Sequence, residues 1–506
     1  MMQTRTMASM TSKARIVHPE FGTGNILSWT LGGVSALVQF DAENLPREVL
    51  RRDFDPDYTI TMRENNEELP PPLRSALSIE AMRLGVVPCA DLTQTTVGRD
   101  LEIELVKQDL EDCKNYGGAR RAFLGEYGQG KTHFLELSQQ IALKKNFVVS
   151  KVVLDHSENS PSQPKRIYHA VVKSMVYPDR PDELEGLRPL LEKASQNPEI
   201  MEKFLLKAAK GSRTTNLKAQ LDAGLHLYLS PALAYMKALS DPATLKVSGE
   251  VENIELWAES ARHALLDWIE GHPTQSNQDI NTELNRIKGR FHRIYSLLDF
   301  RPWAKIYGYL LNGIAYLCKA VGYAGLVVVI DEAEFYSLLS SQNRVFAKHL
   351  FQAWSHATGG KNEASLPFSQ EELLVGGYGI QRELPTRYDD DAKLYLVFAM
   401  TPNSDGVRVL HEAIEPQSIC YLNALSDIDY LQITRRVCEL YTKAYPQDPL
   451  PDGLSLPLSE VVNGLVQQGQ FTNPRQVMKF LTEFLDIVRY RPDLLPSVLQ
   501  NLMESI

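Results

Sequence analysis

The sequence predicts an α/β protein, in which a parallel β-sheet carries a large helical insertion and a C-terminal helical lid, and a small all-β barrel precedes the sheet. Three observations predict this fold class. Residues 325–330 and 394–400 are continuous apolar runs, as expected for strands buried on both faces of a parallel sheet. A glycine-rich loop joins a short strand at residues 122–124 to a helix at 132–143. Residues 14–58 alternate apolar and polar residues between glycine turns, which is typical of a small antiparallel barrel.

The order of these patterns divides the chain into four predicted regions. Residues 1–62 form the barrel, and residues 63–76 form a charged linker with consecutive prolines. Residues 77–425 form the core, and its helical insertion covers about residues 161–319, far more than a βαβ crossover needs. Residues 426–506 form the lid.

The composition is that of a globular protein that folds without disulfides. Hydrophobic residues make up 43% of the 506 residues and charged residues 23%, both ordinary values. The formal net charge of −10 repels nucleic acid, so any DNA contact requires a local basic patch. No signal peptide or membrane span is expected, which favours a cytoplasmic location. Five widely spaced cysteines show no metal-binding pattern and are expected to be reduced thiols: Cys89, Cys113, Cys318, Cys420 and Cys438.

The strongest chemical signal is the loop between the short strand and its helix, Gly125–Thr132, a complete G-x-x-x-x-G-K-[ST] motif. Glycines let backbone N–H groups turn towards phosphate oxygens, and the helix N-terminus adds positive potential. Lys131 is expected to reach the β and γ phosphates of ATP, and Thr132 to hold Mg²⁺. The alternative is a chance glycine-rich turn. The predicted nucleotide contacts are Gly125, Glu126, Tyr127, Gly128, Gln129, Gly130, Lys131, Thr132 and His133.

An acidic pair follows the buried strand at residues 325–330 and completes the predicted site. Asp331 lies at the carboxyl end of this strand, where a metal ion lies in a P-loop fold, so we expect it to bind Mg²⁺. Glu332 is the expected catalytic base for the water that attacks the γ-phosphate. Two alternatives remain: Glu332 stabilises a helix N-terminus, or Glu334 is the base.

Two further positions are candidate catalytic groups. Thr401 and Asn403 directly follow the strand at residues 394–400, where a polar side chain can touch the γ-phosphate or the attacking water. A plain turn or helix-capping role is the alternative. Arg475 opens an amphipathic helix, where an arginine is unfavourable for the helix dipole, so it is expected to face an anion unless it is an ordinary surface residue.

A basic segment, residues 286–295, mixes arginine, lysine and histidine with aromatic side chains. Such a patch can bind a nucleic-acid backbone, although a run of this kind is more often the solvated face of a helix. The sequence shows no signature of a second enzymatic chemistry.

Three segments of the core, 78–88, 123–134 and 321–334, resemble the ATP-binding proteins of BREX phage-resistance loci. The resemblance covers roughly residues 75–490 and is loose across the helical insertion. It implies an ATPase of a phage-defence system, with ATP and Mg²⁺ as cofactors.

Residues 97–100 and 473–475 resemble segments of origin-recognition and other AAA+ ATPases, in which the second motif supplies the sensor-2 arginine of a helical lid. This resemblance implies that Arg475 contacts the γ-phosphate. A lid that moves with the nucleotide would shift a neighbouring subunit packed on it, so a homo-oligomer is expected. No arginine finger matches, and Arg435 and Arg436 are unsupported candidates.

Residues 17–26, with 38–41 closing the barrel, resemble the Tudor-like modules of UvrD-type helicases and CarD-type regulators. This resemblance spans about 45 residues and implies docking onto nucleic-acid machinery. The module departs from the pattern of BREX ATP-binding proteins, which leaves open a neighbouring defence system.

The sequence thus predicts a Mg-ATP-hydrolysing motor or switch of an anti-phage system, with protein partners from the same locus and DNA as a further candidate partner. Two alternatives stay open. One is a nucleotide-dependent scaffold with negligible hydrolysis, and the other is a loader of the origin-recognition type that acts on DNA.

Overall fold

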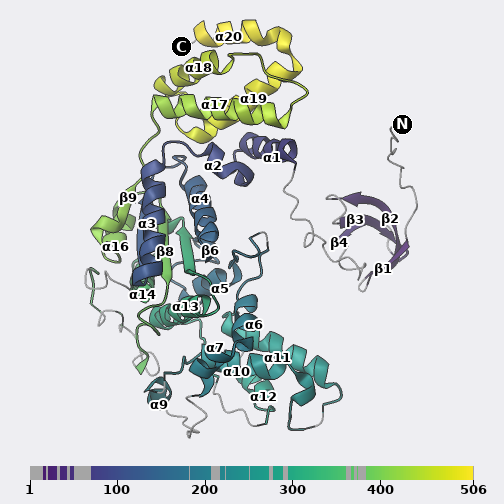
Figure 1. The fold of residues 1–506 in the computed structure, drawn as a ribbon, viewed down its shortest axis with the longest axis vertical. Helices are drawn as coiled ribbons and strands as arrows, with labels where there is room; N and C mark the ends of the chain where they lie inside the picture. The colour runs from purple at the N-terminus through teal and green to yellow at the C-terminus, as the bar shows by residue number, and fades with distance from the viewer. Residues whose placement is uncertain are drawn as a thin grey trace. The chain divides into compact units, whose positions relative to one another are not determined.

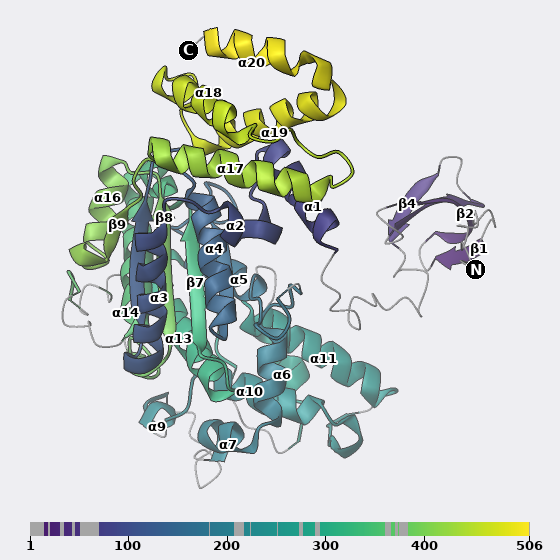
Figure 2. The same ribbon diagram turned by 45° about the horizontal axis from the view of Figure 1, so that its top comes forward.

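The computed structural model describes residues 15–18, 21–30, 35–42, 46–50, 70–181, 183–206, 217–222, 224–249, 251–272, 277–288, 294–359, 366–369, 373 and 383–504. The chain divides into two compact units, Met1–Arg74 and Ser75–Ile506, each of which has its own internal contacts. Figures 1 and 2 show the ribbon in two orientations.

The N-terminal unit contains a four-stranded antiparallel sheet in the order β1-β2-β3-β4. Its small core contains the buried side chains of Ile26, Val38, Phe40 and Val49. Gly24 lies so close to this core that an added Cβ would be 2.8 Å from Phe40. In the described residues β1 and β4 are the two edges, so closure into a barrel stays a prediction. The strands are β1 (Arg15–His18), β2 (Gly22–Thr30), β3 (Ser35–Phe40) and β4 (Arg47–Leu50).

The second unit is built on a five-stranded parallel sheet in the order β6-β7-β8-β5-β9, which confirms the predicted mixed α/β class. Every residue of β7 and β8 is buried, in agreement with their continuous apolar sequences. The strands are β5 (Ala119–Leu124), β6 (Phe147–Val153), β7 (Gly325–Asp331), β8 (Leu394–Met400) and β9 (Ile419–Tyr421).

Helices cover both faces of this sheet because successive side chains of a strand point to opposite faces. Val327 and Val329 of β7 pack in one cluster with α3 (Asp100–Tyr116) and α4 (Lys131–Lys144). Val328 and Ile330 pack on the other face in a larger cluster with α13 (Ala304–Ala320) and α14 (Ser341–Thr358).

The segment between β6 and β7 is helical throughout most of its described residues. Its helices extend the larger cluster and lie at the end of this unit opposite the C-terminal helices (Figure 1). Before α13 they are α5 (Pro164–Lys173), α6 (Arg188–Gln196), α7 (Pro198–Met201), η5 (Glu202–Leu206), α9 (Leu217–Asp222), α10 (Leu229–Leu239), η6 (Pro242–Thr244), α11 (Ile254–Ile269), α12 (Asn277–Leu284) and η7 (Arg301–Trp303).

The lid helices share their hydrophobic core with the segment that precedes the sheet. Ile79 and Met82 of α1 (Pro71–Leu84) and Val97 lie in one cluster with side chains of α17, α18 and α19. Arg83 of α1 also forms an ion pair with Asp486 of α19, with an N–O distance of 2.8 Å. Thus α1, which begins inside the predicted linker, packs with the lid. The lid helices are α17 (Asp427–Ala444), α18 (Ser455–Gln467), α19 (Pro474–Tyr490), η12 (Pro492–Leu494) and α20 (Leu495–Glu504).

Within the described residues, no helix combines the length and the apolar character that a bilayer crossing requires. The cysteines that the structure describes are free: Cys113, Cys318, Cys420 and Cys438.

We predict that Ile79→Ala destabilises the lid by about 2–5 kcal/mol, because Ile79 is fully buried in the shared core and its truncation leaves a cavity. Leu77→Ala is the matched control, since Leu77 lies on the same helix and is 50% exposed. Urea denaturation followed by circular dichroism should show a lower midpoint for the first variant alone. Equal midpoints would show that α1 does not support the lid.

Candidate functional site

The glycine-rich loop connects the carboxyl end of β5 to the start of α4 and turns through two left-handed glycines. Gly128 and Gly130 have φ angles of +83° and +87°, a backbone conformation that other residues rarely adopt. The side chain of Gln129 folds back so that its Oε1 accepts the Glu126 N–H at 2.8 Å. The loop therefore has the tight curvature that a phosphate cradle requires, at the N-terminus of a 14-residue helix.

Lys131, the first residue of α4, points back along this loop. Its ammonium donates hydrogen bonds to the Gly125 carbonyl at 2.8 Å and to Thr401 Oγ1 at 2.9 Å. The residue is 8% exposed. Thr401 directly follows β8, which lies between β5 and β7, so the sheet order brings these two predicted groups together.

Asn403, the other polar residue after β8, has a capping role. Its Oδ1 accepts the Gly406 N–H at 2.8 Å at the start of α16 (Ser404–His411). Of the two alternatives left by the sequence, the described contacts therefore give Asn403 the helix cap and put Thr401 next to Lys131.

Asp331 and Glu332 lie at the same edge of the sheet, at the end of β7. Asp331 is 2% exposed, and burial raises the pKa of its carboxyl group while the ammonium of Lys151, 3.6 Å away, opposes that rise. Asp331 Oδ1 accepts the backbone N–H of Glu332 at 2.9 Å. The Asp331 carboxylate is thus bonded to the backbone N–H of the next residue. Among the ion pairs of the described residues, its cationic partner is Lys151.

Glu332 has a φ of +57°, a left-handed conformation that costs a non-glycine residue about 1–3 kcal/mol and often marks a functional site. Burial, followed by the charge of Glu334, raises the pKa of Glu332 to about 7. Both glutamates lie at η8 (Ala333–Leu338), for which Glu332 is the N-cap residue. Glu332 lines the pocket described next, while Glu334 Oε2 is buried without a hydrogen-bond partner.

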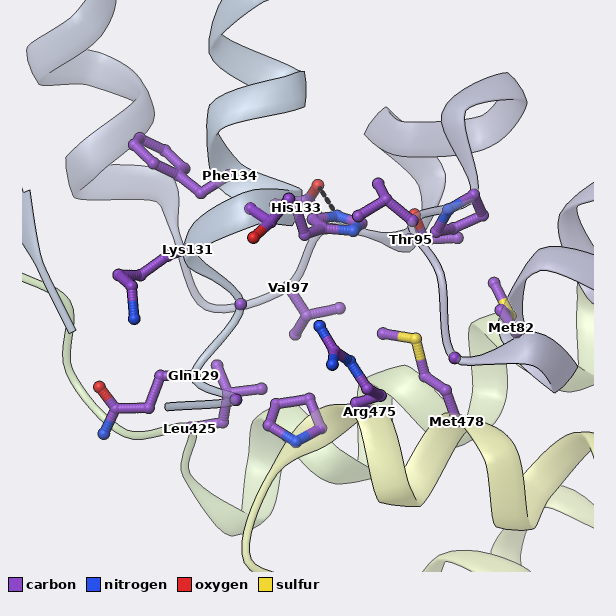
Figure 3. A pocket seen from close by; sticks show the side chains of 18 of the residues that line it. Met82, Thr95, Val97, Gln129, Lys131, His133, Phe134, Leu425, Arg475 and Met478 are labelled. Atoms are coloured by element: carbon purple, nitrogen blue, oxygen red, sulfur yellow. Dashed lines mark hydrogen bonds between the residues drawn. The ribbon is translucent and has the colours of Figure 1, made fainter. Parts of the chain in front are cut away.

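A pocket opens beside the loop, between the core and the lid helices (Figure 3). Its walls come from the segment before α3, from residues 127–134 of the loop and α4, and from the lid. Figure 3 shows Arg475 and Met478 projecting from α19 into this space, close to Val97. Apolar side chains form part of its wall, and these are Met82, Val86, Val97, Leu425, Ile433 and Met478. The pocket thus combines apolar side chains with the N–H groups of the glycine-rich loop, a mixture that is common in small-molecule sites.

The lid touches the loop directly. Asn473, the N-cap of α19, packs so closely on Gly128 that an added Cβ would lie 2.6 Å from the Asn473 Cβ. Two residues later, Arg475 has its guanidinium 6.0 Å from the ring centre of Tyr127. Of the predicted nucleotide contacts, residues 127–133 line this pocket together with Arg475, whereas Gly125 and Glu126 do not.

Arg99 is a residue of this site to which the sequence analysis gave no role. Its guanidinium donates to the Gln129 carbonyl of the loop and to the Asn423 carbonyl before the lid, each at 2.9 Å. The residue is 5% exposed, so its guanidinium is largely shielded from water and is held by these carbonyls. A signal was present, because an arginine just before a helix N-terminus is electrostatically unfavourable unless it has another partner.

His133 faces away from the loop towards α2 (Leu92–Thr95), where its Nε2 lies 2.7 Å from Thr96 Oγ1. Burial, together with the positive charge of Arg99, lowers the pKa of His133 to about 4, so its imidazole is neutral near pH 7. Its side chain therefore closes the pocket wall without adding charge.

The other basic candidates make local contacts. Arg436 donates to the Gln94 carbonyl at 3.0 Å and thus ties α17 to α2, whereas Arg435 pairs with Glu439 on its own helix. In the basic segment, Arg286 pairs with Glu283 and stacks over Trp257. Residues 289–293 of that segment lie outside the described residues, so its nucleic-acid role stays a prediction.

The donor set at the loop suits a hard divalent cation. Among the described residues, no group of three or more histidine, cysteine or carboxylate side chains forms a metal cage. Mg²⁺ does not need one, because proteins commonly bind it through one or two oxygen ligands together with substrate phosphates and water. Thr132, in the first turn of α4, and Asp331, at the end of β7, carry oxygen groups of this kind.

Comparison with known proteins agrees with this geometry. The model of a family described as "BREX system ATP-binding protein BrxC/D" matches residues 71–354, more than half of the chain. A search of curated proteins found no match. The matched region contains the glycine-rich loop, Asp331 and Glu332, whereas Thr401 and Arg475 lie beyond it. The chain therefore belongs to the family of BREX system ATP-binding proteins BrxC/D.

Proposed function

We propose that this chain is a cytoplasmic, AAA+-like ATPase that binds and hydrolyses Mg-ATP and acts as a motor or switch in an anti-phage defence system. One observation carries the proposal. The Lys131 ammonium, held by the loop, contacts Thr401 at the strand edge where Asp331 and Glu332 also lie. A cation, a hydroxyl and two carboxylates at one edge are the parts that phosphoryl transfer to water requires.

The chain's own groups would divide the work of binding. The loop N–H groups and Lys131 would hold the phosphates, and the apolar pocket wall would hold the base. Thr132 and Asp331 would hold Mg²⁺, which neutralises the phosphate charge that develops during transfer. The contacts of Arg99 with the loop and with Asn423 support this role, because they fix the loop before nucleotide arrives.

Hydrolysis would depend on Glu332 accepting a proton from the attacking water. Its position on the pocket wall supports this role over Glu334, which does not line the pocket. Lys131, Thr401 and Arg475 would stabilise the charge on the γ-phosphate, each from a different element.

A nucleotide-dependent scaffold is the second candidate function, and one observation favours it. Both arginine-finger candidates already have partners within the chain, since Arg436 donates to the Gln94 carbonyl and Arg435 pairs with Glu439, and an arginine finger contributes strongly to hydrolysis where one is used. Turnover that stays undetectable in the wild-type chain, despite tight ATP binding, would establish the scaffold instead.

For partners, we propose a homo-oligomer that works with proteins of the same defence locus. The antiparallel sheet of the N-terminal unit is the proposed docking module, in line with its resemblance to Tudor-like modules. DNA would be reached through such partners or through the basic segment, and DNA-stimulated turnover would point to the loader function.

We predict that Lys131→Ala lowers ATP affinity by roughly 10- to 100-fold, because it removes the cation that faces the phosphates. Glu332→Gln should keep ATP affinity and lose at least about 100-fold in turnover, since the amide preserves shape and lacks basicity. Equilibrium binding of a fluorescent ATP analogue and phosphate release measure the two effects. Unchanged ATP affinity in Lys131→Ala would contradict the proposed nucleotide site. Normal turnover in Glu332→Gln would make Glu334 the candidate for the catalytic base.

We predict that Gly128→Ala weakens ATP binding more than Gly130→Ala does. Both positions have positive φ, but an added Cβ meets Asn473 only at Gly128 and nothing within 4 Å at Gly130. Adding Asn473→Gly should restore part of the affinity of the first variant and none of the second. Equal losses without rescue would show that the lid does not rest on the loop.

We predict that ATP favours a larger oligomer than ADP does, with hydrolysis blocked by Glu332→Gln. Arg475 would contact the γ-phosphate and hold the lid at a nucleotide-dependent angle, and couplings of this kind are worth about 1–3 kcal/mol. Adding Arg475→Ala should remove the difference and keep ATP binding. Mass photometry that shows one species in every condition would refute the switch.

A further inference from the structure

Lys151 interrupts an apolar row on the sheet face beneath α4. Phe147 and Val149 of β6 are buried in the cluster on that face, and Lys151 is the next residue of the strand that points the same way. Its side chain is 18% exposed, so the strand carries a largely buried cation where its pattern calls for an apolar residue.

The Lys151 ammonium lies between two carboxylates. It donates a hydrogen bond to Glu136 Oε1 of α4 at 2.7 Å and lies 3.6 Å from Asp331 Oδ2. Glu136 alone suffices to neutralise the ammonium. The second contact therefore has its main effect on Asp331, whose side chain is 3% exposed and is the proposed Mg²⁺ ligand.

An ammonium and a divalent cation compete for such a carboxylate. The two cations repel each other at a few ångströms, and repulsion is strong where burial lowers the local dielectric constant. A bound triphosphate reverses the balance, since its negative charge attracts the divalent ion more strongly than the monovalent ammonium. Glu136, already bonded to Lys151, then remains as its anionic partner.

We propose that Lys151 is the resident counter-ion of Asp331 and makes entry of the divalent metal depend on bound ATP. Without nucleotide it opposes metal binding at Asp331, and with ATP bound it is held by Glu136. The inference rests on the proposed function of the site. It adds a residue that makes metal binding follow ATP binding.

The test measures metal binding to the full-length chain without turnover. Mn²⁺ serves as the probe, and its free concentration is read by electron paramagnetic resonance. Lys151→Met keeps the apolar stem and removes the charge, so the nucleotide-free variant should bind Mn²⁺ roughly tenfold or more tightly than the wild type. Lys145→Met is the matched control, because it removes the same charge from the more exposed Lys145–Glu111 pair and should leave Mn²⁺ affinity unchanged.

A second variant tests the opposite direction. Glu136→Gln leaves Asp331 as the only carboxylate beside Lys151, so Mn²⁺ affinity in the presence of a non-hydrolysable ATP analogue should fall. This variant also keeps the test decisive if Lys151→Met does not fold. Analogue binding without metal should stay unchanged in both variants.

The outcomes separate this inference from the proposed function. If Asp331→Asn weakens Mn²⁺ binding while Lys151→Met and Glu136→Gln leave it unchanged, Lys151 is a structural ion pair and the inference fails alone. An equal gain in Lys145→Met also overturns it, since any lost surface cation would then suffice. If Asp331→Asn has no effect on Mn²⁺ binding in the analogue complex, the proposed metal site fails as well.

Discussion

The carboxyl edge of the parallel sheet is the constraint on which the site depends. Parallel strands all end at the same edge, so groups that follow different strands meet there whatever their separation in sequence. Lys131 and Thr401 are 270 residues apart and form a hydrogen bond because β5 and β8 are neighbours. Asp331 ends β7, the strand on the other side of β8. The helical insertion lengthens the connection before β7 without moving this edge.

The site depends secondly on the lid. The hydrophobic core of the lid is built from segments that precede the sheet in sequence and from segments that follow it. Residues of α1 and Val97 share a hydrophobic cluster with α17, α18 and α19, and Arg436 bonds to α2. Arg99 then connects the glycine-rich loop to the chain just before the lid. The loop and the lid are therefore joined by direct contacts, on which the proposed nucleotide-dependent switch relies.

Much of the core could be predicted because its signals are local. The run Leu394–Met400 has the bounds of β8 as predicted, and the helix predicted at 132–143 is α4, Lys131–Lys144. Features that depend on tertiary contacts were out of reach. The three residues of β9 are too few to show a pattern, and the helical spacing of α1 does not say which core it joins.

The site shows the same division between local and tertiary information. Residue types at strand ends identified Asp331, Glu332 and Thr401 as candidates. The left-handed backbone of Glu332 and the ion pairs of Lys151 follow from packing around them, and no spacing rule encodes either. The hydrogen bonds of Arg99 to the loop and to Asn423, and the apolar pocket wall, likewise appear only when segments far apart in sequence meet.

Photo-crosslinking with 8-azido-ATP most directly tests the claim that nucleotide binds between the loop and the lid. The azide is on the adenine ring, so it reacts with the residues that surround the bound base. Peptide mapping should find ATP-competed adducts in the segments that form the apolar wall, around Met82–Val97 or Leu425–Met478. Adducts confined to residues 161–319, or labelling that excess ATP does not prevent, would contradict a nucleotide site between the loop and the lid.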